Sequence, residues 1–331
     1  MVVDDESSGQ RLDNFLMRQL KGVPKTHVYQ LIRSGQVRLN RGRASADTRI
    51  ACGDQVRVPP VRVSEHAQAK AQAMSQRATQ GSKQREFAML YEDDALLALD
   101  KPAGVAVHGG SGISFGVIEQ LRMARPQAPL LELVHRLDRE TSGVLLVAKK
   151  RSVLKDLQQQ FRSRQTAKTY LALVQGTWPA NKKVIDAPLR KTLKPVGADG
   201  HGAGERHVKV TMQDDPEGQS AVTLVKVLAR LQRAAHSSGT PTALTLLEVT
   251  IKTGRTHQIR VHLAAQGHPI VGDDKYGDFE ANKSWAKLGL KRMFLHAWRL
   301  AFDHCLRHER ITLQADLPAP LKEFLDACQA V

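Results

Sequence analysis

The chain has 331 residues, of which 41% are hydrophobic and 25% are charged, so it can bury a substantial core. Lys and Arg outnumber Asp and Glu by 49 to 33, which gives a formal net charge of +16 and indicates a polyanionic partner. This composition excludes a mostly disordered chain, a collagen and a disulfide scaffold, and no run of about 18 apolar residues predicts a membrane span. The acidic N-terminus lacks a signal-peptide pattern and the three cysteines are far apart, which together predict a cytoplasmic protein.

Residues 1–63 are predicted to form a small domain of two helices and two strands. Apolar residues recur at helical spacing over 11–20 and again from 24 or 25 to 34, while polar and apolar residues alternate as in strands over 36–40 and 54–58. The segment holds 11 basic and 6 acidic residues. Its clustered cations suit contacts with a phosphate backbone, and a solvated charged face is the alternative. These cations are Lys21, Lys25, Arg33, Arg38, Arg41 and Arg43.

Residues 64–86 are predicted to be a linker. They contain five alanines and five glutamines, and Met74 is their only bulky apolar residue, so the segment has no apolar face to pack on a core. An exposed helix is the alternative, because Ala, Gln and Lys favour helices. Either structure would separate the first domain from a larger one at 87–331.

The larger domain opens with a predicted hairpin and a glycine-rich loop. Two apolar stretches within 90–102 flank an acidic turn, which indicates two paired strands. The loop at 107–112 contains His108 but has neither of the two common spacings of phosphate-binding loops. The loop is therefore predicted to face a substrate rather than to bind a nucleotide cofactor.

The segment 131–148 carries the densest polar cluster of the chain. Its apolar end predicts a buried strand. If residues 134–138 are extended, Val134, Arg136 and Asp138 point to one side, so a carboxylate and a guanidinium lie together at the end of the strand. A structural ion pair that caps a turn is the alternative.

A second polar cluster, at 253–263, follows an alternating strand at 245–252. A helix is predicted to begin near Thr253. His257 and His262 are five residues apart, which is not the spacing of two metal ligands on one helix face, so the histidines are predicted to form hydrogen bonds or to lie in the core and no metal is predicted. Between the clusters, the strand at 167–174 carries Tyr170, for which packing on the sheet is the ordinary role.

Taken together, these motifs resemble the RNA pseudouridine synthases that act on large-subunit ribosomal RNA. The matching segments are 135–143, 168–170 and 254–262, in the order that the family shows. The first domain resembles the S4 RNA-binding domain in 10–16, 34–40 and 53–58. Segments 19–25 and 106–112 are similar to the C-type subgroup, which modifies separate uridines of 23S ribosomal RNA.

The resemblance implies an isomerisation that needs no cofactor, because no electrons enter and no group is lost. It assigns Asp138 as the reacting carboxylate, acting either as a nucleophile or as a base. It assigns Arg260 as the cation that keeps Asp138 ionised. Arg136 would fill the space that the flipped uridine leaves, Tyr170 would stack on the base, and Leu295 would cover its other face. His108 would contact the substrate.

The implied fold is α+β, with a small S4-like domain and a mixed, mostly antiparallel catalytic sheet on which the three motifs converge. Segments 195–221 and 234–243 are predicted to be surface loops that lengthen hairpins. The expected partner is 23S ribosomal RNA or a large-subunit assembly intermediate, bound by a monomer away from any membrane. The alternatives are a noncatalytic RNA-binding or assembly factor, a synthase that acts on transfer RNA or on a different ribosomal helix, and, more remotely, a hydrolase built on the histidines.

Overall fold

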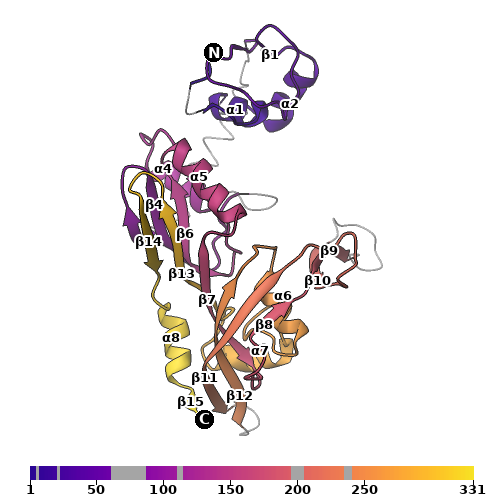
Figure 1. The fold of residues 1–331 in the computed structure, drawn as a ribbon, viewed down its shortest axis with the longest axis vertical. Coiled ribbons are helices and arrows are strands. Elements are labelled where there is room, and N and C mark those ends of the chain that lie inside the picture. Colours follow the sequence, from indigo (N-terminus) through magenta and orange to yellow (C-terminus); the bar gives the residue numbers. More distant parts are fainter. Residues whose placement is uncertain (5–6, 21–22, 61–86, 110–114, 195–204, 235–240) are drawn as a thin grey trace. The chain divides into compact units, whose positions relative to one another are not determined.

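The computed structural model describes residues 1–4, 7–20, 23–60, 87–109, 115–194, 205–234 and 241–331 (Figure 1). The predicted linker at 64–86 lies outside these residues. The chain divides into two compact units, one of Met1–Glu86 with Lys150–Ser152 and one of Phe87–Lys149 with Val153–Val331. Within the described ranges, no helix is long and apolar enough to cross a membrane.

The small unit has the two helices and two strands that the sequence predicts. They are α1 (Leu12–Gln19), α2 (Lys25–Arg33), β1 (Arg38–Leu39) and β2 (Val56–Arg57), with β1 and β2 antiparallel. The apolar faces of both helices and Val56 of β2 pack into one core. The core residues that the helices contribute are Leu12, Phe15, Leu16, Val28, Leu31 and Ile32.

The large unit is built on one mixed sheet of mostly antiparallel strands, as predicted (Figure 1). Its main path runs β15-β11-β12-β7-β13-β6-β4-β3, with β14 on β13, β5 on β6 and β8 on β11, and only the β13–β6 pairing is parallel. The predicted hairpin is β3 and β4. The strands are β3 (Met89–Glu92), β4 (Leu96–Lys101), β5 (Glu132–Leu133), β6 (Ser142–Ala148), β7 (Ala167–Gln175), β8 (Val184–Asp186), β11 (Val222–Ala234), β12 (Pro241–Ile251), β13 (Leu295–His304), β14 (Glu309–Gln314) and β15 (Gln329–Ala330).

Helices cover the sheet on both faces at β6, which is why all seven residues of that strand are apolar or small and buried. Val144, Leu146 and Ala148 pack with α5 (Arg151–Arg162), whereas Leu145 and Val147 pack with α4 (Val117–Ala124), as the period of two requires. The largest core lies where β7, β12 and β13 meet the remaining helices. These are α6 (Gln258–Ala265), α7 (Phe279–Lys287) and α8 (Ala319–Asp326).

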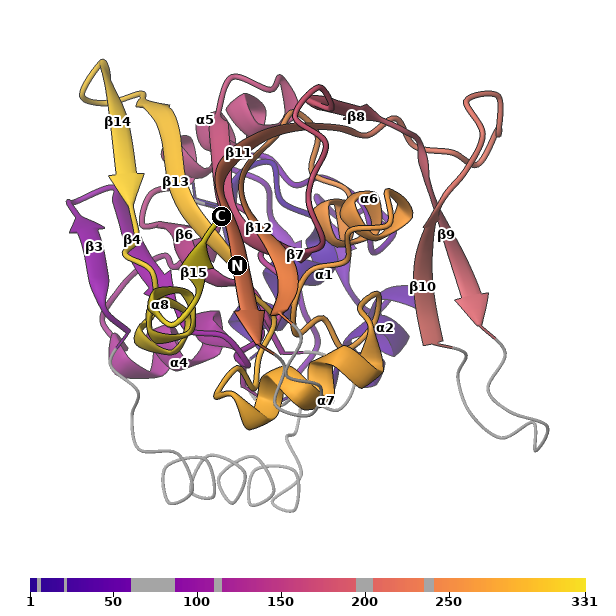
Figure 2. The same cartoon turned by 90° about the horizontal axis from the view of Figure 1, so that it is seen from below.

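A separate two-stranded hairpin, β9 (Leu189–Lys194) and β10 (Glu205–Val210), lies beside α6 (Figure 2). It corrects the prediction of one loop over 195–221, because 205–210 is a strand whose Val208 is buried against Leu189 and Val261. Polar and apolar residues alternate over only four residues, 207–210, and the flanking sequence is rich in Gly and Asp. The strand was therefore not predicted. The remaining 195–204 lies outside the described residues, as does 235–240, and Pro241 already belongs to β12.

Gly143 brings the polar segment before β6 close to β13. Its φ is +112°, and a Cβ atom at this position would overlap the carbonyl oxygen of Ala297. Only glycine therefore allows β6 and β13 to approach in their parallel pairing of His296 with Ser142. This approach places the residues before Ser142 next to Leu295 at the start of β13.

Candidate active site

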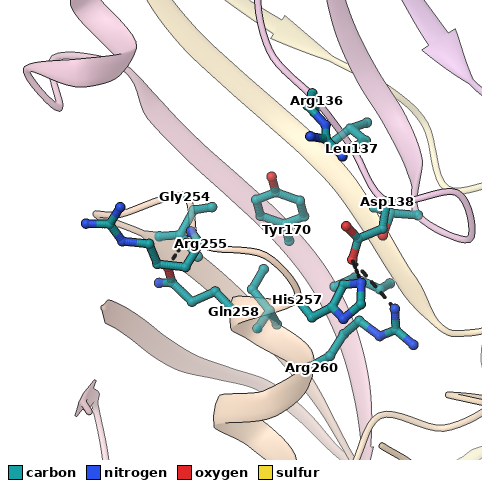
Figure 3. Close-up of a pocket in the computed structure, with 13 residues that line it drawn as sticks. Arg136, Leu137, Asp138, Tyr170, Gly254, Arg255, His257, Gln258 and Arg260 are labelled. Carbon is teal, nitrogen blue, oxygen red and sulfur yellow. Dashed lines mark hydrogen bonds and ion pairs between the residues drawn. The ribbon is translucent and has the colours of Figure 1, made fainter. Parts of the chain in front are cut away.

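A pocket in the large unit collects residues from both polar clusters and from the three strands β7, β12 and β13 (Figure 3). Five of the six catalytic and substrate-binding residues that the sequence assigns line it, although they come from four separate segments. They are Arg136, Asp138, Tyr170, Arg260 and Leu295. His108 is exposed, with its Nδ1 atom 3.0 Å from the carbonyl of Gly109, and it does not line the pocket; loop residues 110–114 lie outside the described ranges.

The segment 134–138 does not continue the strand β5. The prediction that Val134, Arg136 and Asp138 point to one side of an extended strand is therefore wrong. The backbone N–H of Val134 still donates to Leu146, but the N–H of Leu146 donates to Nε2 of His135 at 3.2 Å instead of to a backbone carbonyl. The ladder ends there, and a turn follows in which the N–H of Thr141 donates to the carbonyl of Asp138 at 3.1 Å. Val134 is consequently buried in the core while Arg136 is exposed.

Asp138 projects from this turn toward two cationic or polar side chains. Its Oδ2 lies 3.6 Å from Nη1 of Arg260 and 3.9 Å from Nε2 of His257. Oδ2 is therefore the carboxylate oxygen closest to both of these residues. The Asp138 side chain is 31% exposed, which lets a ligand in the pocket reach the carboxylate.

Arg260 is rigidly positioned by a second carboxylate, Asp273. The pair is bidentate, with Nε to Oδ2 at 2.8 Å and Nη2 to Oδ1 at 2.7 Å, and both side chains are buried. Burial opposes the charge on Asp273, but the hydrogen bonds and the charge of Arg260, together with the backbone N–H groups of Lys275 and Tyr276, outweigh it and lower the pKa of Asp273. Because Asp273 occupies Nε and Nη2, Nη1 is the guanidinium nitrogen directed at Asp138.

The helix of the second cluster begins later than predicted, at Gln258 rather than near Thr253. The side-chain oxygen of Gln258 accepts from the Thr253 hydroxyl at 2.7 Å and from the Arg255 N–H at 3.1 Å, which holds 253–257 as a loop. His257 is the residue before the helix and has a left-handed backbone, with φ +54°. The loop conformation turns its side chain toward Asp138 (Figure 3).

The other histidine of this cluster has the core role that was predicted. His262 is fully buried, and its two ring nitrogens lie 2.9 Å from the Thr223 hydroxyl and 2.9 Å from the carbonyl of Ala187. In the part of the chain that the structure describes, no group of three His, Cys, Asp or Glu side chains could hold a metal ion.

Tyr170 and Leu295 give the pocket its apolar surface. Tyr170 lies on β7 opposite Val249 of β12, and Leu295 is 3% exposed at the start of β13. Burial and the nearby charge of Asp138 raise the pKa of Tyr170 well above its usual range, so the phenol stays protonated. Figure 3 shows Arg136 on the opposite side of Tyr170 from Arg260.

A buried lysine supports the turn that carries Asp138. Lys101 is fully buried, and its Nζ donates to the carbonyls of Pro102, Val105 and Arg139 at 2.8, 2.8 and 3.0 Å. Burial lowers the pKa of Lys101 to about 7. The ammonium thus links the end of β4 to the residue directly after Asp138.

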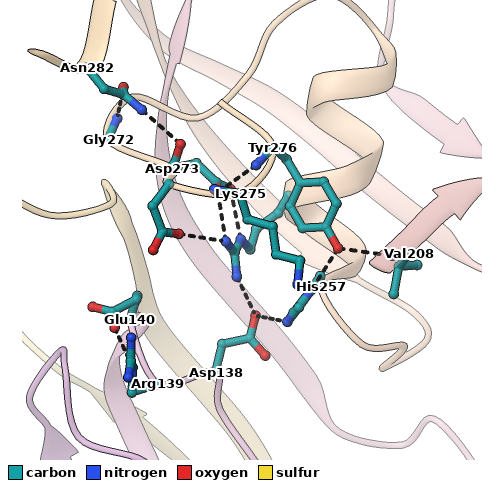
Figure 4. Close-up of polar contacts among 12 residues, drawn as sticks. Asp138, Arg139, Glu140, Val208, His257, Gly272, Asp273, Lys275, Tyr276 and Asn282 are labelled. Atoms are coloured by element: carbon teal, nitrogen blue, oxygen red, sulfur yellow. Dashed lines mark hydrogen bonds and ion pairs between the residues drawn. The ribbon is translucent and has the colours of Figure 1, made fainter. Parts of the chain in front are cut away.

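Three residues of this site, His257, Asp273 and Tyr276, had no role assigned from the sequence (Figure 4). His257 was predicted only to form hydrogen bonds or to lie in the core. Asp273 and Tyr276 belong to the segment GDDKYG at 272–277, which follows two buried apolar residues. The sequence signal for these residues was a pair of carboxylates between two glycines, directly after buried apolar residues. This pattern indicates a turn that could carry functional groups.

Comparison with known proteins identifies the class. The model of the RNA pseudouridylate synthase family matches residues 95–265, and the S4 domain model matches residues 10–56. The chain belongs to the RNA pseudouridylate synthase family and is an isomerase that acts on RNA. The resemblance that the motifs indicated is confirmed, as is the α+β fold.

Several named proteins are similar to this chain over nearly its whole length. The ribosomal large subunit pseudouridine synthase C of Pasteurella multocida is 45% identical and covers 99% of this chain and 93% of its own. The protein of the same name from Yersinia pestis is 46% identical over 98% and 94%. Among solved structures, human RNA pseudouridylate synthase domain containing 4 has a TM-score of 0.56 at 26% identity, covering 79% of this chain and 98% of its own.

Proposed function

We propose that this protein isomerises specific uridines of 23S ribosomal RNA to pseudouridine, with Asp138 as the reacting carboxylate. The observation that carries the proposal is the pocket in which Asp138, with Oδ2 closest to Arg260 and His257, lies next to Tyr170 and Leu295. The relatives of about 45% identity, whose names give the ribosomal large subunit as their target, support the choice of RNA. The protein would act as a cytoplasmic monomer on the RNA or on a large-subunit assembly intermediate.

In this reaction the bond between the uracil nitrogen and the ribose breaks, the base rotates, and a carbon–carbon bond forms to the same ribose. The carboxylate of Asp138 would attack the nucleoside as a nucleophile or remove a ribose proton as a base. The uridine must first leave its stack, which costs a few kcal/mol. Stacking on Tyr170 contributes roughly 1–3 kcal/mol against that cost, with Leu295 on the other face of the base and Arg136 in the vacated space.

The small unit is proposed to bind the RNA backbone, with 1–63 as the binding domain, 64–86 as the linker and 87–331 as the catalytic domain. Arg38 pairs with Arg57 across β1 and β2, so two like charges lie directly opposite each other. Arg41 lies at the tip of the tight turn after β1 with φ +68°. Both arrangements cost stability in the free protein, and a bound polyanion would relieve the repulsion between the two arginines. The structure describes neither Lys21 nor the side chain of Lys25.

Removing the gene should abolish pseudouridine at specific positions of 23S RNA and leave transfer RNA unchanged. Pseudouridines would be mapped in both RNA classes from the deletion strain, and a plasmid copy of the gene should restore the missing positions. Loss of transfer-RNA pseudouridine with intact 23S positions would favour the transfer-RNA alternative. Unchanged modification in both classes would favour a noncatalytic factor.

Replacing Arg33, Arg41 and Arg43 together with Gln should weaken RNA binding and flatten its dependence on salt. All three side chains are exposed, and each lost phosphate contact lowers the logarithmic salt slope by about 0.7–0.9, so the slope should fall by about 2. The measurement is the Kd for a 23S RNA fragment at several salt concentrations. The matched control removes three exposed lysines of the large unit, Lys283, Lys287 and Lys322. An equal fall in both variants would contradict a specific role for the small unit.

A further inference from the structure

Tyr276 contacts both groups that hold Asp138 (Figure 4). Its hydroxyl lies 2.8 Å from Nδ1 of His257, and its ring packs edge-on against the imidazole with centroids 5.5 Å apart. The guanidinium of Arg260 lies over the same ring, 5.2 Å from its centroid. Tyr276 therefore contacts both His257 and Arg260, the two residues closest to Oδ2 of Asp138.

The directions of these hydrogen bonds follow from the backbone. The N–H of Val208, on β10, reaches the Tyr276 hydroxyl at 3.2 Å and can only donate. Among the described residues, the hydroxyl has contacts to this N–H and to Nδ1 of His257, and of these two groups only Nδ1 can offer a lone pair. We therefore assign the Tyr276 hydrogen to the bond with Nδ1, so that the neutral imidazole carries its own hydrogen on Nε2.

We propose that His257 is a positioning residue that donates from Nε2 to Oδ2 of Asp138, with its tautomer set by Tyr276. This inference rests on the proposed role of Asp138. Together with Arg260, His257 places two donors on Oδ2 and leaves Oδ1 for the uridine. The 3.9 Å separation describes the protein without RNA, and it shortens to a hydrogen bond when the base fills the pocket.

The surroundings keep His257 and Tyr276 neutral, as this arrangement requires. Burial lowers the pKa of His257, although Asp138 acts against that shift. Burial also raises the pKa of Tyr276 to about 12, so its hydroxyl keeps the hydrogen that it donates. His257 thus acts on Asp138 as an oriented hydrogen-bond donor, and Arg260 supplies the charge.

The tautomer can be observed without any activity measurement. In the full-length protein labelled with ¹⁵N-histidine, long-range ¹H–¹⁵N spectra distinguish a protonated ring nitrogen from an unprotonated one. We expect His257 to show an unprotonated Nδ1 and a protonated Nε2, and Tyr276→Phe, which keeps the ring but removes the hydroxyl, should give a mixture. A protonated Nδ1 in the unsubstituted protein, or an unchanged spectrum in Tyr276→Phe, would overturn the proposal.

Two substitutions of His257 separate a positioning role from a structural one. Asn tolerates the left-handed backbone at this position but its amide reaches only as far as Nδ1, whereas the amide of Gln reaches the place of Nε2. We expect His257→Asn to lower the single-turnover rate about 10- to 100-fold with an unchanged Kd for RNA, and His257→Gln to restore most of the rate. Equal rates for the two variants would contradict the role, as would a normal rate for Asn.

A double-mutant cycle tests whether Tyr276 acts through His257. Tyr276→Phe should slow the reaction in the unsubstituted protein and have no further effect in His257→Asn, whereas additive losses would overturn the link. If Asp138 is not the reacting carboxylate, Asp138→Asn will retain activity, while the tautomer of His257 and its dependence on Tyr276 stay as proposed. Failure of the proposed function can therefore be distinguished from failure of this inference.

Discussion

Replacing Asp138 with Asn should lower the rate of pseudouridine formation by about 10⁴-fold or more, because the amide is neither a nucleophile nor a base of useful strength. The substitution preserves the size of the side chain, and 31% of that side chain is exposed, so the fold and the Kd for RNA should stay the same. The measurement is a single-turnover assay on a 23S RNA fragment, together with thermal unfolding as a check on the fold.

Asp274→Asn is the matched control for this experiment. Asp274 is a second carboxylate near Arg260, with Oδ1 at 3.3 Å from Nη2, but its side chain is 70% exposed. An exposed ion pair contributes at most about 1 kcal/mol, so the rate should change by no more than about fivefold. A normal rate in Asp138→Asn would show that another group performs the reaction.

Replacing Asp273 with Asn should destabilise the protein and also slow the reaction. Asp273 is 1% exposed and Arg260 is 5% exposed, so the substitution removes the closest counter-charge of a buried guanidinium. Breaking a buried ion pair in this way costs about 3–5 kcal/mol. The backbone N–H groups of Lys275 and Tyr276 donate to Oδ1 at 2.9 and 3.0 Å, and the amide oxygen of Asn can still accept both bonds, so the expected loss comes from the charge.

The free energy of unfolding from urea titrations checks the first effect, and the single-turnover rate at a temperature where the variant is folded checks the second. Asp274→Asn again serves as the control, because it changes a carboxylate on the same guanidinium at the surface, where we expect a loss below about 1 kcal/mol. A loss of stability in Asp273→Asn no larger than in this control would contradict a structural role of the buried pair.

The distribution of apolar residues predicted the elements whose burial is simple. The helices of the small unit follow from a period of 3.6, the β3–β4 hairpin from two apolar stretches around an acidic turn, and the strand β6 from a nearly continuous apolar run. The prediction failed where a side chain replaces a backbone partner. His135 ends the ladder before Asp138, and Gln258 holds a loop where a helix was expected to begin. The periodicity of apolar residues does not show where a side chain takes the place of a backbone hydrogen-bond partner.

The sequence by itself determined the family and the S4-like segment, because the ordered motifs carry these identities locally. It also predicted Asp138, Tyr170 and Arg260 as site residues, and the structure brings these three into one pocket. Only the tertiary structure decided how Asp138 is held. His257 approaches Asp138 directly, Asp273 orients Arg260, and Tyr276 links His257 to Val208 on β10, so the arrangement depends on how these elements pack. A pattern along the chain records which residues are buried, whereas the direction of a hydrogen bond depends on the groups that the fold places on either side of it.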